Sequence, residues 1–133
     1  MRATARQRGG LVQAVEIDGH EIVVDEPLDS GGTGTAPSPT RLLTASLAAC
    51  TAITVQLYAA RKGWNVDGLQ VDADFAGAPR AGETPRFDVV LTLPDGLDAE
   101  QRKRIIVIAG KCPVHRTLAA GSDIVTTERR EGP

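Results

Sequence analysis

The feature that most constrains the fold is a long stretch, Pro39 to Lys62, in which nearly every face of a helix would be apolar or small. Ser38 is a suitable N-cap, Pro39 suits the first helical turn, and Gly63 is a plausible stop. A helix that is apolar nearly all round must be covered by other parts of the protein. Threonine, serine and glutamine interrupt its apolar run, so we expect a buried central helix and not a membrane span.

Strand patterns stand on both sides of this helix. Before it, Leu11–Ile17 and His20–Val24 are predicted strands, and Asp18-Gly19 between them is a two-residue hairpin signal. After it, residues 69–75 and 87–93 alternate apolar and polar side chains. We expect these two segments to form half-buried strands that pair antiparallel.

A second helix is predicted from about Asp98 to Gly110, because Asp98 and Gln101 have the spacing of a capping box. A short helical turn at Pro113–Ala119 and a last strand at Ile124–Thr127 are expected to follow. Three stretches are typical of linkers: Pro27–Pro39, Gly77–Pro85 and Arg129–Pro133. The predicted order is ββ-α-ββ-α-β, with antiparallel sheets packed against helices, which is the α+β class.

The composition fits a single domain spanning residues 1–133 and excludes some functions. Aromatic residues make up 3% of the chain, the formal net charge is −2, and the basic residues are spread along the sequence. Neither base stacking nor a basic face supports a nucleic-acid partner. The first ten residues are polar and charged, without the apolar core of a secretory signal, so a cytoplasmic location without a membrane partner is expected.

The chain has two cysteines, which in a cytoplasmic protein should not form a static disulfide. Cys50 lies in the middle of the apolar helix, and Cys112 lies in the segment Lys111-Cys112-Pro113-Val114-His115-Arg116. No CxxC motif is present, which argues against a thioredoxin-like site and a four-ligand zinc site. Either cysteine alone could be a small buried apolar residue, although the cations around Cys112 would stabilise a thiolate.

Two motifs occur in a defined order around these cysteines. The first comprises Pro37-Ser38-Pro39, Leu42-Leu43, Ala48–Val55, Tyr58-Ala59 and Arg61–Trp64, preceded by Asp25-Glu26-Pro27 and Gly31-Gly32-Thr33; the second is Lys111–Leu118. Together they resemble the OsmC/Ohr family of thiol-dependent peroxidases and organic hydroperoxide resistance proteins. The resemblance extends over roughly Leu11 to Thr127, which is nearly the whole chain.

This resemblance implies an intertwined homodimer with active sites at the subunit interface. It implies that Cys50 attacks an organic hydroperoxide and that Cys112 resolves the resulting sulfenate as a disulfide, which a dithiol then reduces without a cofactor. The family stabilises its thiolate with an arginine from the N-terminal strands, oriented by a glutamate before the central helix. Thr40 and Arg41 occupy the positions of that glutamate here. Arg8 is the best-placed arginine, with Arg6 and Arg41 as alternatives.

Two other hypotheses remain open from the sequence. The missing glutamate favours a non-catalytic protein of the same fold, which would bind a hydrophobic ligand or sense redox state at the dimer interface. The retained cysteine pair opposes that hypothesis, since binding needs neither thiol. A zinc site formed by Cys50, Cys112 and His115, with water as the fourth ligand, is the third hypothesis.

Overall fold

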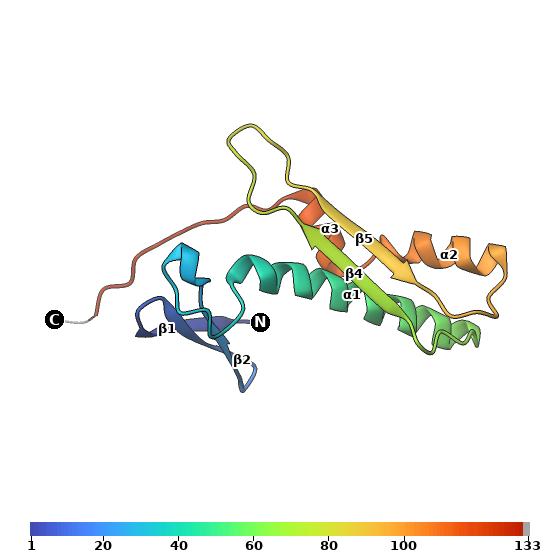
Figure 1. Ribbon diagram of the computed structural model, residues 1–133, viewed down its shortest axis with the longest axis horizontal. Helices are drawn as coiled ribbons and strands as arrows, with labels where there is room; N and C mark the ends of the chain where they lie inside the picture. The colour runs from blue at the N-terminus through green and yellow to red at the C-terminus, as the bar shows by residue number, and fades with distance from the viewer. Residues whose placement is uncertain (132–133) are drawn as a thin grey trace. The chain divides into compact units, whose positions relative to one another are not determined.

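The structure is a computed structural model that describes residues 1–131 (Figure 1). Its elements are, in order, β1 (Ala3–Gly9), β2 (Val12–Ile17), β3 (His20–Val24), a 3₁₀ turn (Leu28–Ser30), α1 (Pro39–Lys62), β4 (Gln70–Phe75), β5 (Phe87–Thr92), α2 (Ala99–Ala109) and α3 (Pro113–Ala120). The α+β class with antiparallel sheets and one long helix is confirmed. The chain divides into two compact units, one of Met1–Ala49 with Val71–Leu91 and one of Cys50–Gln70 with Thr92 onward.

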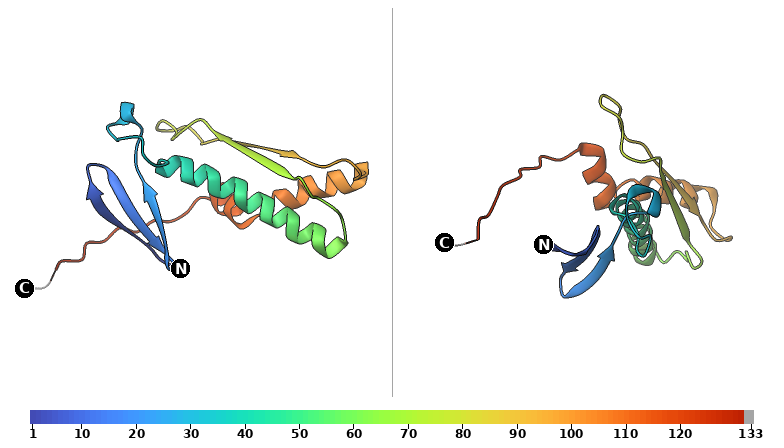
Figure 2. Two further views of the ribbon diagram at one scale, coloured as in Figure 1. Left: turned by 60° about the horizontal axis from the view of Figure 1, so that its bottom comes forward. Right: turned by 60° about the vertical axis from the view of Figure 1, so that its left-hand side comes forward.

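The first unit contains an antiparallel sheet in the order β1-β2-β3 (Figure 2). Its predicted hairpin is confirmed, because Ile17 pairs with His20 around a turn in which both Asp18 and Gly19 have positive φ. Strand β1 was not expected from the sequence, and the predicted two strands are therefore three. Its side chains are almost all exposed, so it lacks the alternating apolar pattern by which a half-buried strand is recognised.

The loop between β3 and α1 is tied together by Asp25, whose side chain is 1% exposed. One carboxylate oxygen, Oδ2, accepts hydrogen bonds from the backbone amide and the hydroxyl of Thr33 and from the same two groups of Thr35. These bonds, the Thr33 hydroxyl first, hold the pKa of Asp25 well below its usual range, with a further contribution from the Glu26 amide. The loop is therefore organised around one buried charge.

Gly32 lies in the same loop, against the backbone of Glu26. A Cβ atom at residue 32 would lie 1.9 Å from the carbonyl oxygen of Glu26 and 2.5 Å from its carbonyl carbon. The loop backbone therefore approaches itself at a distance that only glycine allows.

Strands β4 and β5 pair as a second sheet, joined by the predicted linker at residues 77–85. Their side chains alternate between half-buried and exposed, as the sequence predicts. The Phe75 and Phe87 rings stack with centroids 4.2 Å apart at the end of the pair near the linker.

The second unit packs the C-terminal half of α1 with α2 and α3. The predicted capping box of α2 is confirmed, since Asp98 and Gln101 exchange two hydrogen bonds of 2.8 Å. The buried side chains of this unit are Thr51, Val55, Ala59, Ile105, Ile108, Ala109 and Cys112. The core of this unit therefore includes Cys112 and lies beside Cys50.

The predicted strand Ile124–Thr127 is wrong. Residues 121–131 form neither helix nor strand, and Ile124 and Val125 are each 85% exposed. A strand needs a neighbour for its backbone hydrogen bonds, and a short apolar run does not itself supply one. The last two residues of the predicted linker Arg129–Pro133 lie outside the described residues.

The central helix begins and ends as predicted, with Gly63 at positive φ directly after it. Only one row of its side chains is buried, at the spacing i, i+4: Leu47, Thr51, Val55 and Ala59. Ile53 and Leu57 are 55% and 61% exposed, so the expectation of a helix buried on most faces is not met within one chain. By length and composition alone α1 could also cross a bilayer, a test that core helices of soluble proteins pass as well.

Candidate active site

The structure brings the two cysteines together in the second unit, although they are far apart in the sequence. Cys50 lies on α1 and is half-buried, while Cys112 directly precedes α3 and has no exposed surface. Both are free thiols, and Cys112 lies close enough to raise the pKa of Cys50. Thr51, the neighbour of Cys50 on α1, donates its hydroxyl to the Cys112 sulfur at 3.8 Å.

Cys112 is the N-cap of α3. Its Sγ accepts a hydrogen bond of 3.2 Å from the backbone amide of His115, the third residue of the helix. Pro113 occupies the first helical position, where its missing amide hydrogen costs no helical hydrogen bond. The local sequence therefore fixes both the start of α3 and the position of the sulfur.

The environment of Cys50 disfavours its thiolate. Burial raises the pKa of this thiol, and the contact with Cys112 raises it further. Two donors act in the opposite direction, because the backbone amide of Val114 and the hydroxyl of Thr54 both bond to the sulfur. The net effect raises the pKa of Cys50, and a nearby cation would favour its thiolate.

Arg8, the predicted thiolate-stabilising cation, lies on β1 in the first unit. Its Nη2 donates to Oε1 of Glu21 on β3 at 3.0 Å, with both side chains about half exposed. Arg6 lies two residues earlier and faces Glu16 at the longer distance of 3.8 Å. Arg41 is exposed in the first turn of α1, where its Nη1 donates to the Ser38 hydroxyl at 3.0 Å.

Sequence reasoning missed a cluster of cations around Tyr58 in the second unit. Arg61, Lys62 and Arg104 each lie 5.7–5.9 Å from the centre of its ring. Arg104 also donates its Nε to the phenol oxygen at 3.1 Å, which joins α2 to α1. The two arginines and the lysine were visible in the sequence, but only the pairing of the helices places Arg104 beside the other two.

These contacts predict an unusual titration of Tyr58, which is the only tyrosine of the chain. The hydrogen bond from Arg104, followed by the charges of Lys62 and Arg104, lowers its pKa below the ordinary value. Ultraviolet absorbance should detect phenolate at a lower pH than for free tyrosine, and Arg104→Gln should move the midpoint back up. Lys103→Gln removes a neighbouring exposed charge on α2 and should leave the midpoint nearly unchanged; an equal shift in both variants would contradict the assignment.

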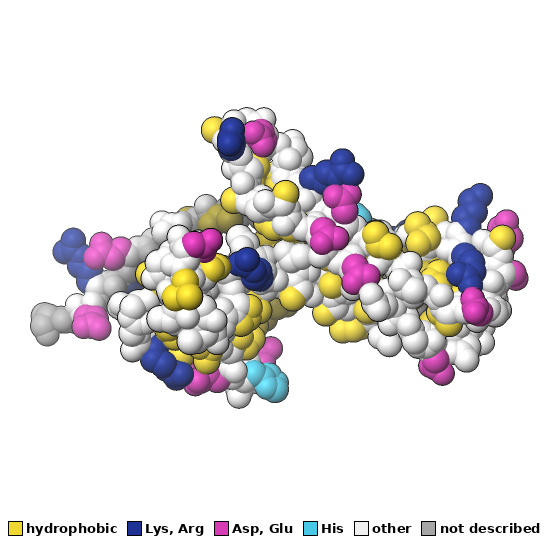
Figure 3. Space-filling view, in the orientation of Figure 1, with side chains coloured by type: hydrophobic (Ala, Val, Ile, Leu, Met, Phe, Trp, Pro, Cys, Tyr) yellow, Lys and Arg dark blue, Asp and Glu magenta, His cyan; other side chains and the backbone are white. Residues whose placement is uncertain are grey.

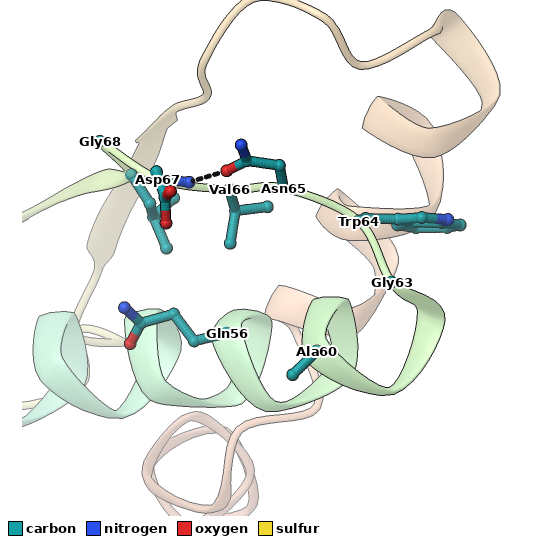
Figure 4. Close-up of a pocket in the computed structure, with 9 residues that line it drawn as sticks. Gln56, Ala60, Gly63, Trp64, Asn65, Val66, Asp67 and Gly68 are labelled. Atoms are coloured by element: carbon teal, nitrogen blue, oxygen red, sulfur yellow. Dashed lines mark hydrogen bonds between the residues drawn. The ribbon is translucent and has the colours of Figure 1, made fainter.

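A separate hollow of about 590 Å³ lies between the end of α1 and the loop that follows it (Figure 4). Gln56 and Ala60 line it from the helix, and residues 63–69 line it from the loop. The side-chain oxygen of Asn65 accepts a 2.8 Å hydrogen bond from the backbone amide of Asp67, which closes a turn in that loop. Neither cysteine lines the hollow, so it is distinct from the sulfur site.

The zinc hypothesis gains no support from the geometry. Among residues 1–131, no three histidine, cysteine or acidic side chains converge closely enough to hold a metal ion. His115 contacts the sulfur of Cys112 through its backbone amide.

Residues 32–127 match the family model described as OsmC-like protein. The fold resembles a Psychrobacter arcticus protein named for osmotic stress induction and a detoxification response (26% identity, TM-score 0.73, covering 86% of this chain and 85% of that one). It also resembles an organic hydroperoxide resistance protein of Elizabethkingia anophelis (26% identity, TM-score 0.65, 86% and 84% covered). The fold alone is shared with an OsmC-like protein of Mycoplasma pneumoniae (22% identity, TM-score 0.75, 89% and 86% covered). No curated protein sequence matches the chain.

Proposed function

Because the chain belongs to the OsmC-like protein family, we propose that it is a thiol peroxidase that reduces organic hydroperoxides with Cys50 and Cys112. The observation that carries this proposal is that the two free thiols are neighbours within one compact unit. A half-buried thiol beside a fully buried one suits attack by the first and resolution by the second.

The reaction has three steps. The Cys50 thiolate attacks the terminal oxygen of the hydroperoxide, the O–O bond breaks, and the alkoxide leaves and takes up a proton to give an alcohol. The Cys112 thiolate then attacks the sulfur of the Cys50 sulfenic acid, which forms the disulfide and releases hydroxide as water after protonation. A dithiol reductant returns both thiols and itself becomes a disulfide.

The first step needs a cation to offset the raised pKa of Cys50, and we assign that role to Arg8. Arg8 forms a 3.0 Å ion pair with Glu21. This carboxylate would orient the guanidinium in place of the glutamate that is missing before the central helix. In this assignment Arg8 reaches a cysteine site when the subunits assemble.

Replacing this cation should slow attack on the peroxide. Arg8→Gln is expected to lower the second-order rate constant for sulfenate formation by about tenfold or more, because an adjacent charge is worth one to several factors of ten in thiolate fraction. The matched control is Arg6→Gln, which removes an arginine two residues away on the same strand. Stopped-flow measurement of sulfenate formation with cumene hydroperoxide compares the two variants. A larger loss of rate in Arg6→Gln would assign thiolate stabilisation to Arg6 in place of Arg8.

We further propose that the protein is a homodimer. Ile53 and Leu57 on α1 and Ile106 and Val107 on α2 are 47–61% exposed. Figure 3 shows hydrophobic side chains on the surface in view. A second copy of the chain would cover such residues.

Sedimentation should give a dimer, and Ile53→Asp should weaken dimer association by about tenfold or more. The control is Ile124→Asp, at a residue that is 85% exposed outside any helix or strand, and this change should leave dimer association unaltered. A wild-type protein that is monomeric at all concentrations would contradict the proposal.

The reduced protein mixed with cumene hydroperoxide tests the proposed function. Both thiols should disappear rapidly, with one equivalent of peroxide consumed, and mass spectrometry should find a Cys50–Cys112 disulfide. Slow oxidation without that disulfide would instead favour a non-catalytic binding or redox-sensing protein of the same fold.

A further inference from the structure

The sulfur of Cys112 is held by donors from two separate elements. The hydroxyl of Thr51 on α1 donates to it at 3.8 Å, and the amide of His115 in α3 donates at 3.2 Å. Thr51 is 1% exposed and Cys112 is 0% exposed, so water does not compete for these bonds. The position of this sulfur is therefore determined by the protein on two sides.

The first turn of α3 also links the two sulfurs to each other. Pro113 has no amide hydrogen, so the first amides that the helix can offer belong to Val114 and His115. The Val114 amide bonds to Cys50, and the His115 amide bonds to Cys112. Two consecutive amides of one turn thus lie beside one sulfur each.

The hydroxyl of Thr51 is unusual for its place in the sequence. It lies in the buried row of α1 with Leu47, Val55 and Ala59, whose side chains are apolar. A buried hydroxyl costs free energy unless it is hydrogen-bonded. The bond to the Cys112 sulfur is one contact that compensates for burying this hydroxyl.

We propose that Thr51 is a positioning residue for disulfide closure, holding the Cys112 sulfur where it attacks the oxidised Cys50 beside it. This inference rests on the proposed peroxidase function and concerns only its second step. In that step the Cys112 thiolate forms the S–S bond, the S–O bond of the Cys50 sulfenic acid breaks, and hydroxide leaves and is protonated to water. Thr51 acts through Cys112 and does not contact the peroxide.

Single-turnover kinetics can separate the two steps. Sulfenate formation is followed with limiting cumene hydroperoxide. The lifetime of the sulfenate is then measured by quenching with dimedone and comparing the amounts of dimedone adduct and disulfide. Thr51→Val is expected to slow closure about two- to tenfold, the usual effect of losing one hydrogen bond, while attack on the peroxide is unchanged. Thr51→Ser keeps the hydroxyl and should restore fast closure, which a purely steric role would not do.

Thr54 on the next turn of α1 supplies the crossed control. Its hydroxyl lowers the pKa of Cys50, so Thr54→Val should slow attack on the peroxide more than it slows closure. If wild type forms no sulfenate, the proposed peroxidase function fails. If wild type closes its disulfide and Thr51→Val closes equally fast, only the role of Thr51 is overturned. Should Thr51→Val fail to fold, Thr51→Ala against Thr51→Ser makes the same comparison.

Discussion

Cys50→Ser should abolish the reaction with hydroperoxides. A serine hydroxyl is far less nucleophilic and far less ionised than a thiol, so the second-order rate constant should fall by a factor on the order of a thousand or more, as for other lost nucleophiles. Competition against a peroxide-sensitive dye measures this loss directly. The variant should remain folded, because serine is nearly the same size and Cys50 is half-buried.

Cys112→Ser provides the contrast, because it removes the resolving sulfur and leaves the attacking one. This variant should consume one equivalent of peroxide at nearly the wild-type rate and then stop, with a sulfenic acid on Cys50 that dimedone traps. Multiple turnover with a dithiol should fall strongly. If Cys112→Ser lost the first step and Cys50→Ser kept it, the roles of the two cysteines would be reversed.

Gly32→Ala should strongly destabilise the first unit. The new Cβ would meet the Glu26 carbonyl oxygen at 1.9 Å and the Asp25 Oδ1 atom at 2.8 Å, so the backbone of the loop must move. That movement would also disturb the hydrogen bonds that surround the Asp25 carboxylate. A loss on the order of 3 kcal/mol in the free energy of unfolding is expected, at the upper end for added side-chain volume in a packed site.

Gly9→Ala is the matched control for this substitution. Nothing lies within 4 Å of a Cβ at residue 9, and its backbone does not have the positive φ that most glycines of the chain adopt. Urea denaturation followed by far-ultraviolet circular dichroism should place Gly9→Ala close to wild type and Gly32→Ala well below it. Equal midpoints for the two variants would show that the loop relaxes freely around the added methyl group.

Elements with strong local signals were predictable from the sequence. The bounds of α1 follow from Ser38, Pro39 and Gly63, and the capping box of α2 follows from two side chains three residues apart. Elements that depend on distant partners were not. Strand β1 is formed by polar residues that pair with β2, and the apolar residues near Ile124 have no pairing strand among the described residues.

The candidate site divides in the same way. Its two cysteines were identified from the sequence, and the structure brings them together. The hydrogen bond from Thr51 to Cys112 could not be read from the sequence, because it depends on how α1 packs against the start of α3. The same holds for the contact between Tyr58 and Arg104, whose residues are 46 positions apart. The role of Arg8 stays a prediction.

The edge-to-face contact of Tyr58 with Trp64, at 5.6 Å between ring centres, has a practical consequence. These are the only tyrosine and the only tryptophan of the chain, and both belong to the unit that contains the cysteines. Intrinsic fluorescence excited in this protein therefore originates almost entirely from one half of the molecule. A change in fluorescence on adding an oxidant would report on the unit that contains the thiols. Melting of the β1-β2-β3 sheet would not change this signal and needs a backbone probe.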